Sequence, residues 1–280
     1  MNDGSPTYVT RMVDLQKEGL FKLFKHVCDE APLRWALALS NLRFRRYGAD
    51  VHVGYDAALR AFKIRSDQDV IYISQRNRIP FYRRGVATRA RKIAEEYLLN
   101  AVPFEANDLV IDCGANVGDL YFWFRPKGVR YVGVEPSPAD FFCLSRNAVD
   151  GDVRHLGLWR ESGELDFYVS AATADSSLIP IDAYEEIIKV PTRRLDELFP
   201  DEPIKLLKLE AEGAEIEVLE GAEAALPNIR YIAADLGFER GVAQESTFAP
   251  VVNTLAAKGF ELLDVNHKRV TALFRNRRDG

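Results

Sequence analysis

The stretch from Leu109 to Tyr121 constrains the fold of this chain most strongly. An apolar run ends in Asp112, and a turn containing Gly114, Asn116 and Gly118 follows it. Glycine adopts left-handed backbone conformations without cost, and Asn tolerates the same conformation. In open α/β sheets ligands bind at the carboxyl ends of strands, next to the N-terminus of the following helix. The stretch therefore predicts the first strand and cofactor loop of an α/β nucleotide-binding fold.

The residues of this turn favour one class of cofactor. Dinucleotide-binding loops carry a middle glycine that lets the backbone approach a pyrophosphate, and Asn116 occupies that place here. Asp112, two residues before Gly114, suits a cofactor with a positive charge, such as the α-ammonium group of S-adenosylmethionine (SAM), because a carboxylate can meet that group directly. We therefore expect SAM rather than NAD. The alternative is a turn that only connects a strand to a helix.

Other predicted strands also end in acidic residues. The segments Tyr131–Glu135, Ile204–Glu210 and Tyr231–Asp235 are apolar runs that finish on a carboxylate. Glu135 is placed to accept both ribose hydroxyl groups of a nucleoside, as happens in NAD and SAM folds alike. A purely structural protein has little reason to gather carboxylates at one sheet edge, so the pattern indicates a functional site.

The end of the chain separates methyltransferases from NAD-binding proteins. Segments 260–265 and 270–274 flank the turn that starts at Asn266, and they predict an antiparallel hairpin. Such a hairpin closing a parallel sheet is typical of class I methyltransferases. We therefore predict an α/β fold with a Rossmann-like class I methyltransferase sheet of seven strands, the last one antiparallel, over residues 101–280. An N-terminal mainly helical, basic extension occupies residues 1–100.

The extension shows two different patterns. Apolar residues recur at helical spacing from Met12 to Leu42 and predict two helices, with Pro32 at a helix start. Residues 51–73 alternate between apolar and polar side chains, which indicates short strands or an extended segment.

Charge is distributed unevenly along the chain. Residues 1–100 contain 18 Lys and Arg and 11 Asp and Glu, which gives a net charge of +7. Residues 101–280 contain 19 Lys and Arg and 31 Asp and Glu, which gives a net charge of −12. Residues 76–92 contain seven basic residues and no acid. Guanidinium groups match phosphate and carboxylate, so Arg83 and Arg84, with Tyr82 beside them, predict contacts to an anionic small-molecule or glycan acceptor. A solvated helix face is the alternative.

Composition narrows the possible partners and the location. The acidic second part disfavours nucleic acid, because it would repel a long polyanion. No apolar run approaches the roughly 20 residues that a membrane helix needs, and the start of the sequence is polar, so we expect a cytoplasmic protein without stable membrane insertion. Three scattered cysteines do not form a disulfide framework. The oligomeric state is open, and a homodimer is one option.

Several motifs resemble the FkbM-type methyltransferases. They are Val110–Gly118, Val134–Pro138, Arg194–Leu198 and the long segment Leu207–Gly221. The resemblance covers about residues 100–275 and implies a SAM-dependent O-methyltransferase, often of sugars in glycans, lipopolysaccharides or natural products. It implies a cofactor site made by residues Asp112, Gly114, Asn116, Gly118, Glu135 and Pro136. Glu210 replaces the usual Asp of the family, and Asp235 stands where Glu is more frequent.

Methyl transfer to a hydroxyl group needs a base that removes the hydroxyl proton. The candidates are His267 in the terminal hairpin turn, Glu210, Glu212 and Asp235. His has the natural pKa for this role, although a lone His in a turn is more often an exposed bystander.

The pair Glu210 and Asp235 could also share Mg²⁺ or another divalent cation, since two neighbouring carboxylates without a counterion repel each other. Lys208, Arg240 or the sulfonium of SAM could instead supply the positive charge. Two other functions compete with methyl transfer: a SAM-binding module without catalysis, and an NAD-dependent oxidoreductase.

Overall fold

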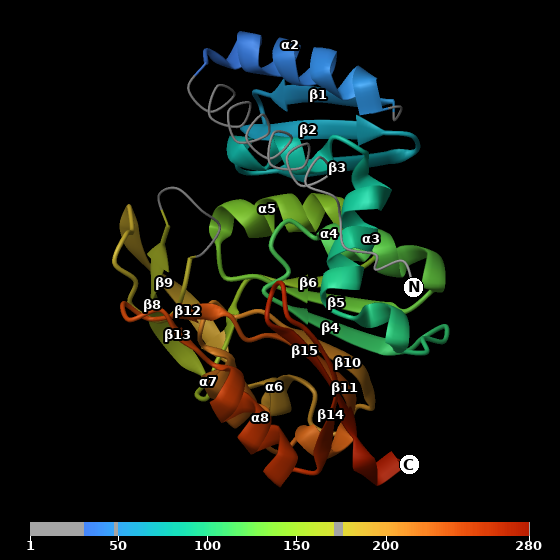
Figure 1. The fold of residues 1–280 in the computed structure, drawn as a ribbon. Coiled ribbons are helices and arrows are strands. Elements are labelled where there is room, and N and C mark those ends of the chain that lie inside the picture. The colour runs from blue at the N-terminus through green and yellow to red at the C-terminus, as the bar shows by residue number, and fades with distance from the viewer. Residues whose placement is uncertain (1–30, 48–49, 171–175, 280) are drawn as a thin grey trace, which may run out of the picture. The chain divides into compact units, whose positions relative to one another are not determined.

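The computed structural model describes residues 31–47, 50–170 and 176–279, and the chain forms two compact units, Met1–Val86 and Ala87–Gly280 (Figure 1). Helix α3 (Val86–Glu96) begins at the end of the first unit, and the rest of it belongs to the second. The first of the two predicted N-terminal helices lies outside the described residues.

The described part of the first unit combines helices with a small antiparallel sheet. Its described elements are α2 (Leu33–Phe44), η1 (Arg45–Tyr47), β1 (Val51–Asp56), β2 (Ala61–Ser66), β3 (Asp69–Ile73) and η2 (Arg76–Tyr82). The three strands pair antiparallel in the order β1-β2-β3. Asn41 of α2 holds β1 by donating to the Val53 carbonyl (2.9 Å) and accepting from the Val53 amide (2.7 Å). The alternating segment 51–73 therefore forms the short strands that its pattern indicated, and α2 and the two 3₁₀ helices flank them.

The second unit is built on a seven-stranded sheet in the order β14-β15-β11-β10-β4-β5-β6. Its strands are β4 (Leu109–Cys113), β5 (Arg130–Val134), β6 (Asp152–Arg154), β10 (Ile204–Leu209), β11 (Ile229–Asp235), β14 (Phe260–Asn266) and β15 (Thr271–Asn276). Strand β15 runs antiparallel to both of its neighbours, and the pairs among β11, β10, β4, β5 and β6 are parallel. This order confirms the predicted class I methyltransferase fold.

Helices cover both faces of this sheet. They are α3, η3 (Leu99–Ala101), α4 (Asp119–Phe124), η4 (Arg125–Lys127), α5 (Pro138–Asn147), α6 (Leu195–Leu198), α7 (Glu215–Glu220), η5 (Leu226–Asn228), α8 (Phe248–Ala257) and η6 (Arg277–Asp279). In Figure 1, α4 and α5 lie on one side of the sheet, and α7 and α8 lie on the other. Such coverage explains why the central strands read as continuous apolar runs.

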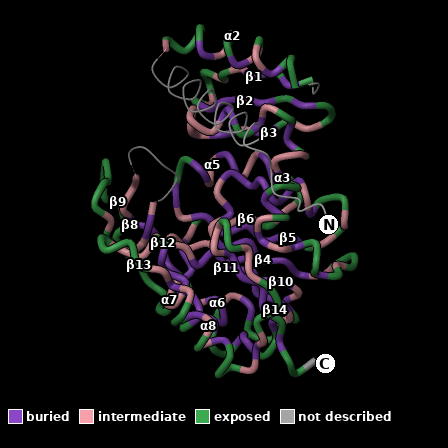
Figure 2. Tube along the Cα trace, viewed as in Figure 1, coloured by how far each residue is buried: buried purple, intermediate pink, exposed green. Residues whose placement is uncertain are grey.

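Burial follows this layering (Figure 2). Strand β4 is buried at every position, and β10 is buried at all positions except Lys205. Ile111, Leu207, Ile232 and Phe274 belong to one hydrophobic cluster that runs across neighbouring strands. The core therefore fixes the strand ends, and with them the acidic residues that follow.

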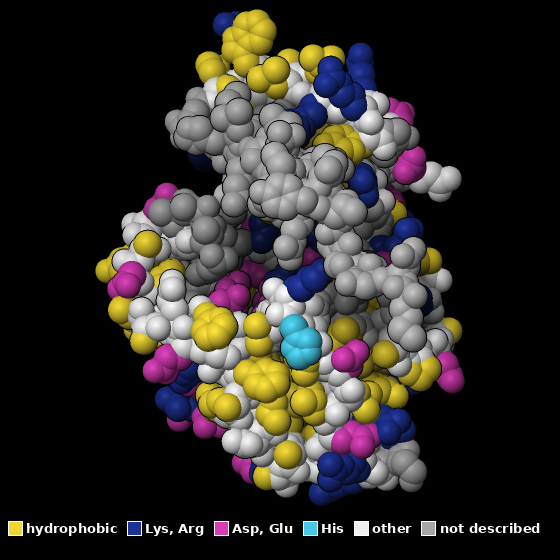
Figure 3. All heavy atoms as spheres, viewed as in Figure 1, with side chains coloured by type: hydrophobic (Ala, Val, Ile, Leu, Met, Phe, Trp, Pro, Cys, Tyr) yellow, Lys and Arg dark blue, Asp and Glu magenta, His cyan; other side chains and the backbone are white. Residues whose placement is uncertain are grey.

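Two small sheets accompany the large one. They are β7 (Gly157–Leu158), β9 (Glu186–Arg193) and β8 (Gly163–Val169) in the order β7-β9-β8, and the pair β12 (Phe238–Arg240) and β13 (Glu245–Ser246). The chain divides segment 152–158 between β6 and β7, which belong to different sheets. Figure 3 shows hydrophobic and acidic side chains intermingled on one face, and the exposed hydrophobic residues of this unit include Phe238 and Leu262.

Helix α7 does not follow β10 directly. Glu212 (φ 49°) and Gly213 (φ 91°) adopt left-handed conformations, which an α-helix excludes. The helix starts at Glu215 instead.

In the part of the chain that is described, the structure contains no helix that combines the length and apolar character needed to cross a membrane.

Candidate functional site

The loop after β4 has the backbone that its sequence predicts. Gly114 (φ 70°), Asn116 (φ 50°) and Gly118 (φ 85°) are all left-handed, and Gly118 precedes α4. A Cβ atom on Gly114 would lie 2.0 Å from the Glu210 carbonyl oxygen, and one on Gly118 would lie 2.8 Å from Leu144 Cδ1. These glycines are therefore required by the chain's own packing. Their contacts to a cofactor stay a prediction.

Glu135 connects this loop to the end of β5. Its carboxylate is buried, and it accepts hydrogen bonds from the backbone N–H groups of Asn116 and Ser137, both at 2.8 Å. Burial, assisted by the negative charge of Asp140, raises the pKa of Glu135 to about 8. Pro136 follows it, and the Pro136 carbonyl oxygen lies 3.1 Å from His155 Nε2. Each Glu135 oxygen keeps a second lone-pair site, so the carboxylate can still accept from ligand hydroxyl groups.

Asp112 contacts a buried cation of the protein itself. Its carboxylate accepts from Tyr131 Oη (2.7 Å) and lies 3.1 Å from Lys208 Nζ. Lys208, which pairs with Asp112 across the β10–β4 ladder, also lies 2.8 Å from Glu210 Oε2 and donates to the Gly114 carbonyl at 2.8 Å. Lys208 therefore gives Asp112 a positive partner from within the protein, and a contact of Asp112 with the ammonium group of SAM stays a prediction.

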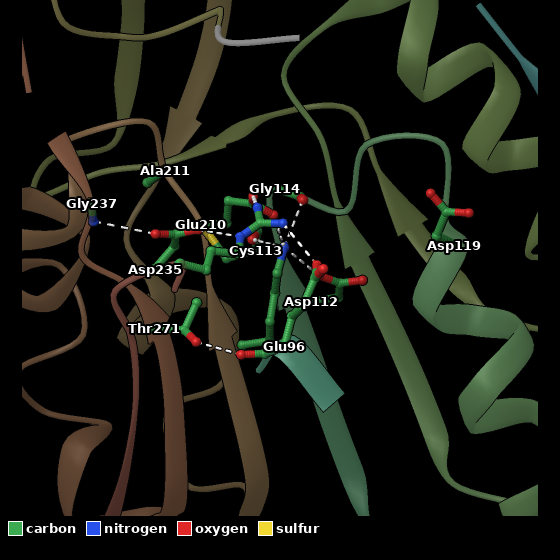
Figure 4. A network of polar contacts seen from close by, with 12 residues as sticks. Glu96, Asp112, Cys113, Gly114, Asp119, Glu210, Ala211, Asp235, Gly237 and Thr271 are labelled. Carbon is green, nitrogen blue, oxygen red and sulfur yellow. Dashed lines mark hydrogen bonds and ion pairs between the residues drawn. The ribbon is translucent and has the colours of Figure 1, made fainter. Parts of the chain in front are cut away.

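Glu210 and Asp235, at the ends of β10 and β11, lie close together in Figure 4. Arg269 binds both carboxylates. Its Nε lies 2.7 Å from Asp235 Oδ2, its Nη2 pairs with Glu210 Oε1, and its Nη1 lies 3.2 Å from Glu96 Oε2. The Tyr97 ring lies beneath the guanidinium, 5.3 Å from Arg269 Cζ to the ring centroid, within the range of a cation–π contact. The arginine comes from the β14–β15 turn, and the sequence analysis did not identify it.

These two cations determine the ionisation of Glu210. Burial alone would raise the pKa of Glu210, but Lys208 and Arg269 lower it to about 2. Asp235 differs, because its burial and the charge of Glu210 raise its pKa despite Arg269. Glu210 is therefore a weak base, and its lone pairs are directed at two cations.

The predicted divalent cation is not supported. The argument for it required Glu210 and Asp235 to lack a counterion, yet the Arg269 guanidinium bridges them and Lys208 adds a second positive charge. Arg240, which the sequence offered as a counterion, instead pairs with Glu217 at 2.7 and 2.9 Å. Among the described residues, no group of three or more His, Cys, Asp or Glu is placed to hold a metal ion.

The remaining predicted residues are dispersed. His267 is exposed in the β14–β15 turn, and Glu212 is half-buried after β10. Tyr82, Arg83 and Arg84 belong to the first unit. Tyr82 is buried, and its contact with an acceptor stays a prediction.

The two arginines of the predicted substrate site differ in exposure. Arg84 is exposed, whereas Arg83 donates to the Pro80 carbonyl (3.4 Å) and lies 5.7 Å from the centroid of the Tyr47 ring. Their role in binding an anionic acceptor stays a prediction.

A cleft of about 350 Å³ opens beside the strand ends of the second unit. Its lining consists of Ser170, Ile181, Asp182, Ala183, Glu212, Phe238, Glu239, Gly241, Val242 and Gln244. Only Glu212 was a predicted site residue. The others lie on loops and on the short strand β12, for which the sequence offers no periodic pattern.

Comparison with known proteins identifies the family of this architecture. A family model described as "Methyltransferase FkbM domain" matches residues 112–262, more than half of the chain. Methyltransferase sdnD of Sordaria araneosa is 28% identical over 174 residues, covering 48% of this chain and 67% of the relative. Methyltransferase 1 of Beauveria bassiana (strain ARSEF 2860) is 27% identical over 154 residues, covering 44% of this chain and 62% of the relative. The chain thus spans about two thirds of the length of these curated relatives.

Solved structures resemble the chain more distantly. A SAM-dependent methyltransferase from Aquifex aeolicus gives a TM-score of 0.40 at 10% identity, covering 68% of this chain and 97% of that one. Magnesium protoporphyrin IX methyltransferase (ChlM) from Synechocystis PCC 6803 with bound SAM gives a TM-score of 0.41 at 11% identity. The match covers 86% of this chain and 92% of that one. Both TM-scores are below 0.5, so the fold assignment rests on the strand order of this chain.

Proposed function

Since this chain belongs to the FkbM methyltransferase family, we propose that it transfers the methyl group of SAM to a hydroxyl group of a sugar or a related polyhydroxylated molecule. Such a reaction belongs to glycan, lipopolysaccharide or natural-product biosynthesis. The observation that carries the proposal is the sheet edge of the second unit, where the ends of four neighbouring strands hold Asp112, Glu135, Glu210 and Asp235. The family match spans this edge.

The loop from Gly114 to Gly118 and the carboxylate of Glu135 form the proposed SAM site. SAM supplies an electrophilic methyl carbon. Glu135 binds the ribose hydroxyl groups with its remaining lone pairs, and its bonds to Asn116 and Ser137 hold the carboxylate in place before the ligand arrives. Lys208 fixes the loop by binding the Gly114 carbonyl.

Calorimetric titration with SAM and, separately, with NADH tests the cofactor. We expect SAM to bind and NADH not to bind. Binding of NADH without binding of SAM would refute the proposed SAM-dependent methyl transfer. Above pH 8, where the Glu135 carboxylate is ionised, Glu135→Ala should weaken SAM binding by about 1.5–3 kcal/mol, the range for a hydrogen bond to a charged group. Glu164→Ala, an exposed acid on β8, is the matched control and should leave SAM affinity unchanged.

The acceptor is tested by incubating the protein with labelled SAM and a panel of sugars, glycans and sugar nucleotides, and detecting methyl incorporation by mass. Methylation of a sugar hydroxyl group supports the proposal. Transfer only to protein or nucleic acid would refute the substrate class. SAM binding without transfer to any member of the panel would favour a SAM-binding module.

An anionic group on the acceptor is the role proposed for the basic segment 76–92. Arg84→Ala should then raise the KM for a phosphorylated or carboxylated acceptor and leave SAM affinity unchanged. Arg60→Ala changes another exposed arginine of the same unit, outside the segment, and serves as the control. Equal KM values for the two variants would make the segment a solvated face.

A further inference from the structure

The cleft lined by Glu212 and Glu239 has the properties of an acceptor site. At about 350 Å³ its volume reaches the range typical of small-molecule sites. Its polar side chains are Ser170, Asp182, Glu212, Glu239 and Gln244, and none of the described residues that line it is Lys or Arg. Hydroxyl groups donate to such carboxylates and to an amide oxygen, whereas a phosphate or carboxylate group would be repelled by them.

Apolar side chains complete the same lining. Ile181, Phe238 and Val242 contribute to it, and Phe238 is 68% exposed in this structure. An exposed aromatic ring beside hydrogen-bonding groups is suited to the apolar face of a sugar ring. Arg240 follows Glu239 in β12, but its guanidinium is bound to Glu217 and to the Gly213 carbonyl and does not line the cleft.

Glu239 links this cleft to the strand-end carboxylates. Gly237 lies between Asp235 and Glu239 in the sequence, and a Cβ atom on it would lie 3.3 Å from Asp235 Oδ1 and 3.7 Å from Glu239 Oε1. The two carboxylates therefore flank one glycine. Asp235 is held by Arg269, whereas the Glu239 carboxylate makes no hydrogen bond or ion pair with any residue that the structure describes.

The surroundings of Glu239 raise the pKa of its carboxyl group. Burial raises the pKa of Glu239 to about 8, and the negative charges of Asp235, Glu210 and Glu215 contribute, while Arg269 acts in the opposite direction. Asp182 and Glu212 share the cleft with it and add no positive charge. A base with a pKa near the working pH is the most efficient acceptor of a proton in a transition state.

On the premise that the chain methylates a hydroxyl group, we propose that Glu239 is the catalytic base and that this cleft holds the reacting, uncharged end of the acceptor. The hydroxyl oxygen gives its proton to a Glu239 carboxylate oxygen and forms a bond to the methyl carbon of SAM. The bond between that carbon and sulfur breaks, and its electron pair stays on sulfur. The protonated Glu239 then releases its proton to solvent.

This assignment replaces the four bases expected from the sequence. Glu210 is held in its ionised form by two cations, Asp235 is engaged by Arg269, and His267 is exposed in the turn after β14. Glu212 remains in the cleft as a hydrogen-bonding neighbour of the acceptor. Of the acids in the cleft, Glu239 is the one tied through Gly237 to the strand ends.

The test compares Glu239→Gln with Glu245→Gln, an exposed acid on the partner strand β13. We expect Glu239→Gln to lower kcat for the best acceptor at least about 100-fold, the lower limit for loss of a general base, with SAM affinity unchanged. The kcat of the wild type should rise with pH to an inflection near 8. That inflection should be lost in Glu239→Gln, and Glu239→Asp should restore part of kcat.

The outcomes separate this inference from the proposed function. If the wild type methylates a hydroxyl acceptor and the kcat of Glu239→Gln stays within about threefold of the kcat of Glu245→Gln, the base assignment is overturned and the function stands. A retained inflection near pH 8 in Glu239→Gln overturns it as well. If the wild type binds SAM but methylates no hydroxyl group, the proposed function fails before any variant is compared, and the base assignment fails with it.

Discussion

Two groups of carboxylates lie at the same edge of the sheet and are treated differently by the fold. Around Lys208 and Arg269, the carboxylates of Asp112, Glu210 and Asp235 each have a cationic partner within hydrogen-bonding distance. In the neighbouring cleft, Glu239 has no such partner among the described residues. The two groups thus consist of the same kind of side chain, but only the first is paired with Lys or Arg.

The difference shows what an acidic sheet edge can do. A carboxylate paired with cations is held in position, and its lone pairs are engaged; at Glu210, where two cations meet, the pKa also falls, so this group is a poor base. At Glu239, partial burial beside other acids raises the pKa, so this carboxylate can take a proton near neutral pH. We therefore assign support of the loop and strand ends to the paired group and proton transfer to the unpaired one.

The largest expected effect comes from removing the central cation of the paired group. Lys208→Met should destabilise the protein by about 3–5 kcal/mol, because it leaves the buried carboxylate of Asp112 without its cation and Glu210 with Arg269 alone. Chemical denaturation measures the change. Lys189→Met removes a lysine from the exposed pair with Asp166 and should cause no measurable change. A similarly small effect of both substitutions would mean that the network does not hold the edge together.

The next effect concerns the glycine that joins the network to the loop. Gly114→Ala should cost about 2–4 kcal/mol, because the new Cβ atom would overlap the Glu210 carbonyl oxygen and the backbone is left-handed. Gly163→Ala is the control, since its Cβ atom meets nothing within 4 Å. If Gly114→Ala folds with unchanged stability but loses SAM affinity, the close approach at this residue is to the ligand and not to Glu210.

Parallel strand ends are the part of the site that the sequence predicts well. The apolar runs that end in Asp112, Glu135, Glu210 and Asp235 must be buried, and parallel pairing then brings their carboxyl ends to one edge. The terminal hairpin also followed from local alternation and its turn. These features are local or periodic, so they are readable without any knowledge of tertiary contacts.

The partners of those carboxylates were not predictable in the same way. Arg269 reaches Glu210 across 59 positions of sequence from a hairpin turn, where no pattern indicates which way a side chain points. The proposed metal failed for this reason, since it treated two acids as an uncompensated pair. Glu239 lies on a strand of three residues, too short for periodicity to mark it. Long-range contacts therefore decided the chemistry, while local pattern decided the fold.

A smaller effect is expected in the pH dependence of stability, where the unpaired Glu239 and the paired Glu210 should behave differently. The folded pKa of Glu239 is raised to about 8, so its charged form costs stability; this cost is absent below its ordinary pKa of 4.5 and complete above pH 8. Glu239→Gln should therefore raise Tm by a few degrees at pH 9 and leave it unchanged near pH 4, with about 2–4 °C expected per kcal/mol in a chain of this size. Scanning calorimetry at both pH values measures it.

Glu210→Gln should show the opposite sign. The folded pKa of Glu210 is lowered to about 2, so its stabilising contribution is present above pH 4.5 and is lost as the pH falls through 2. The variant should then have a lower Tm than the wild type at pH 7. If the two variants shift Tm in the same direction at neutral and alkaline pH, the distinction between a paired and an unpaired group is wrong.

The smallest expected effect is that of removing divalent metal ions. A hard cation shared by Glu210 and Asp235 would have to displace the Arg269 guanidinium, which binds both of them and Glu96 as well. We therefore expect methyl transfer to survive dialysis against EDTA with an unchanged rate, measured on the acceptor found in the screen. Loss of activity that added Mg²⁺ restores would show that Arg269 leaves these carboxylates during turnover. The paired group would then take part in the chemistry, and the division of roles between the two groups would fail.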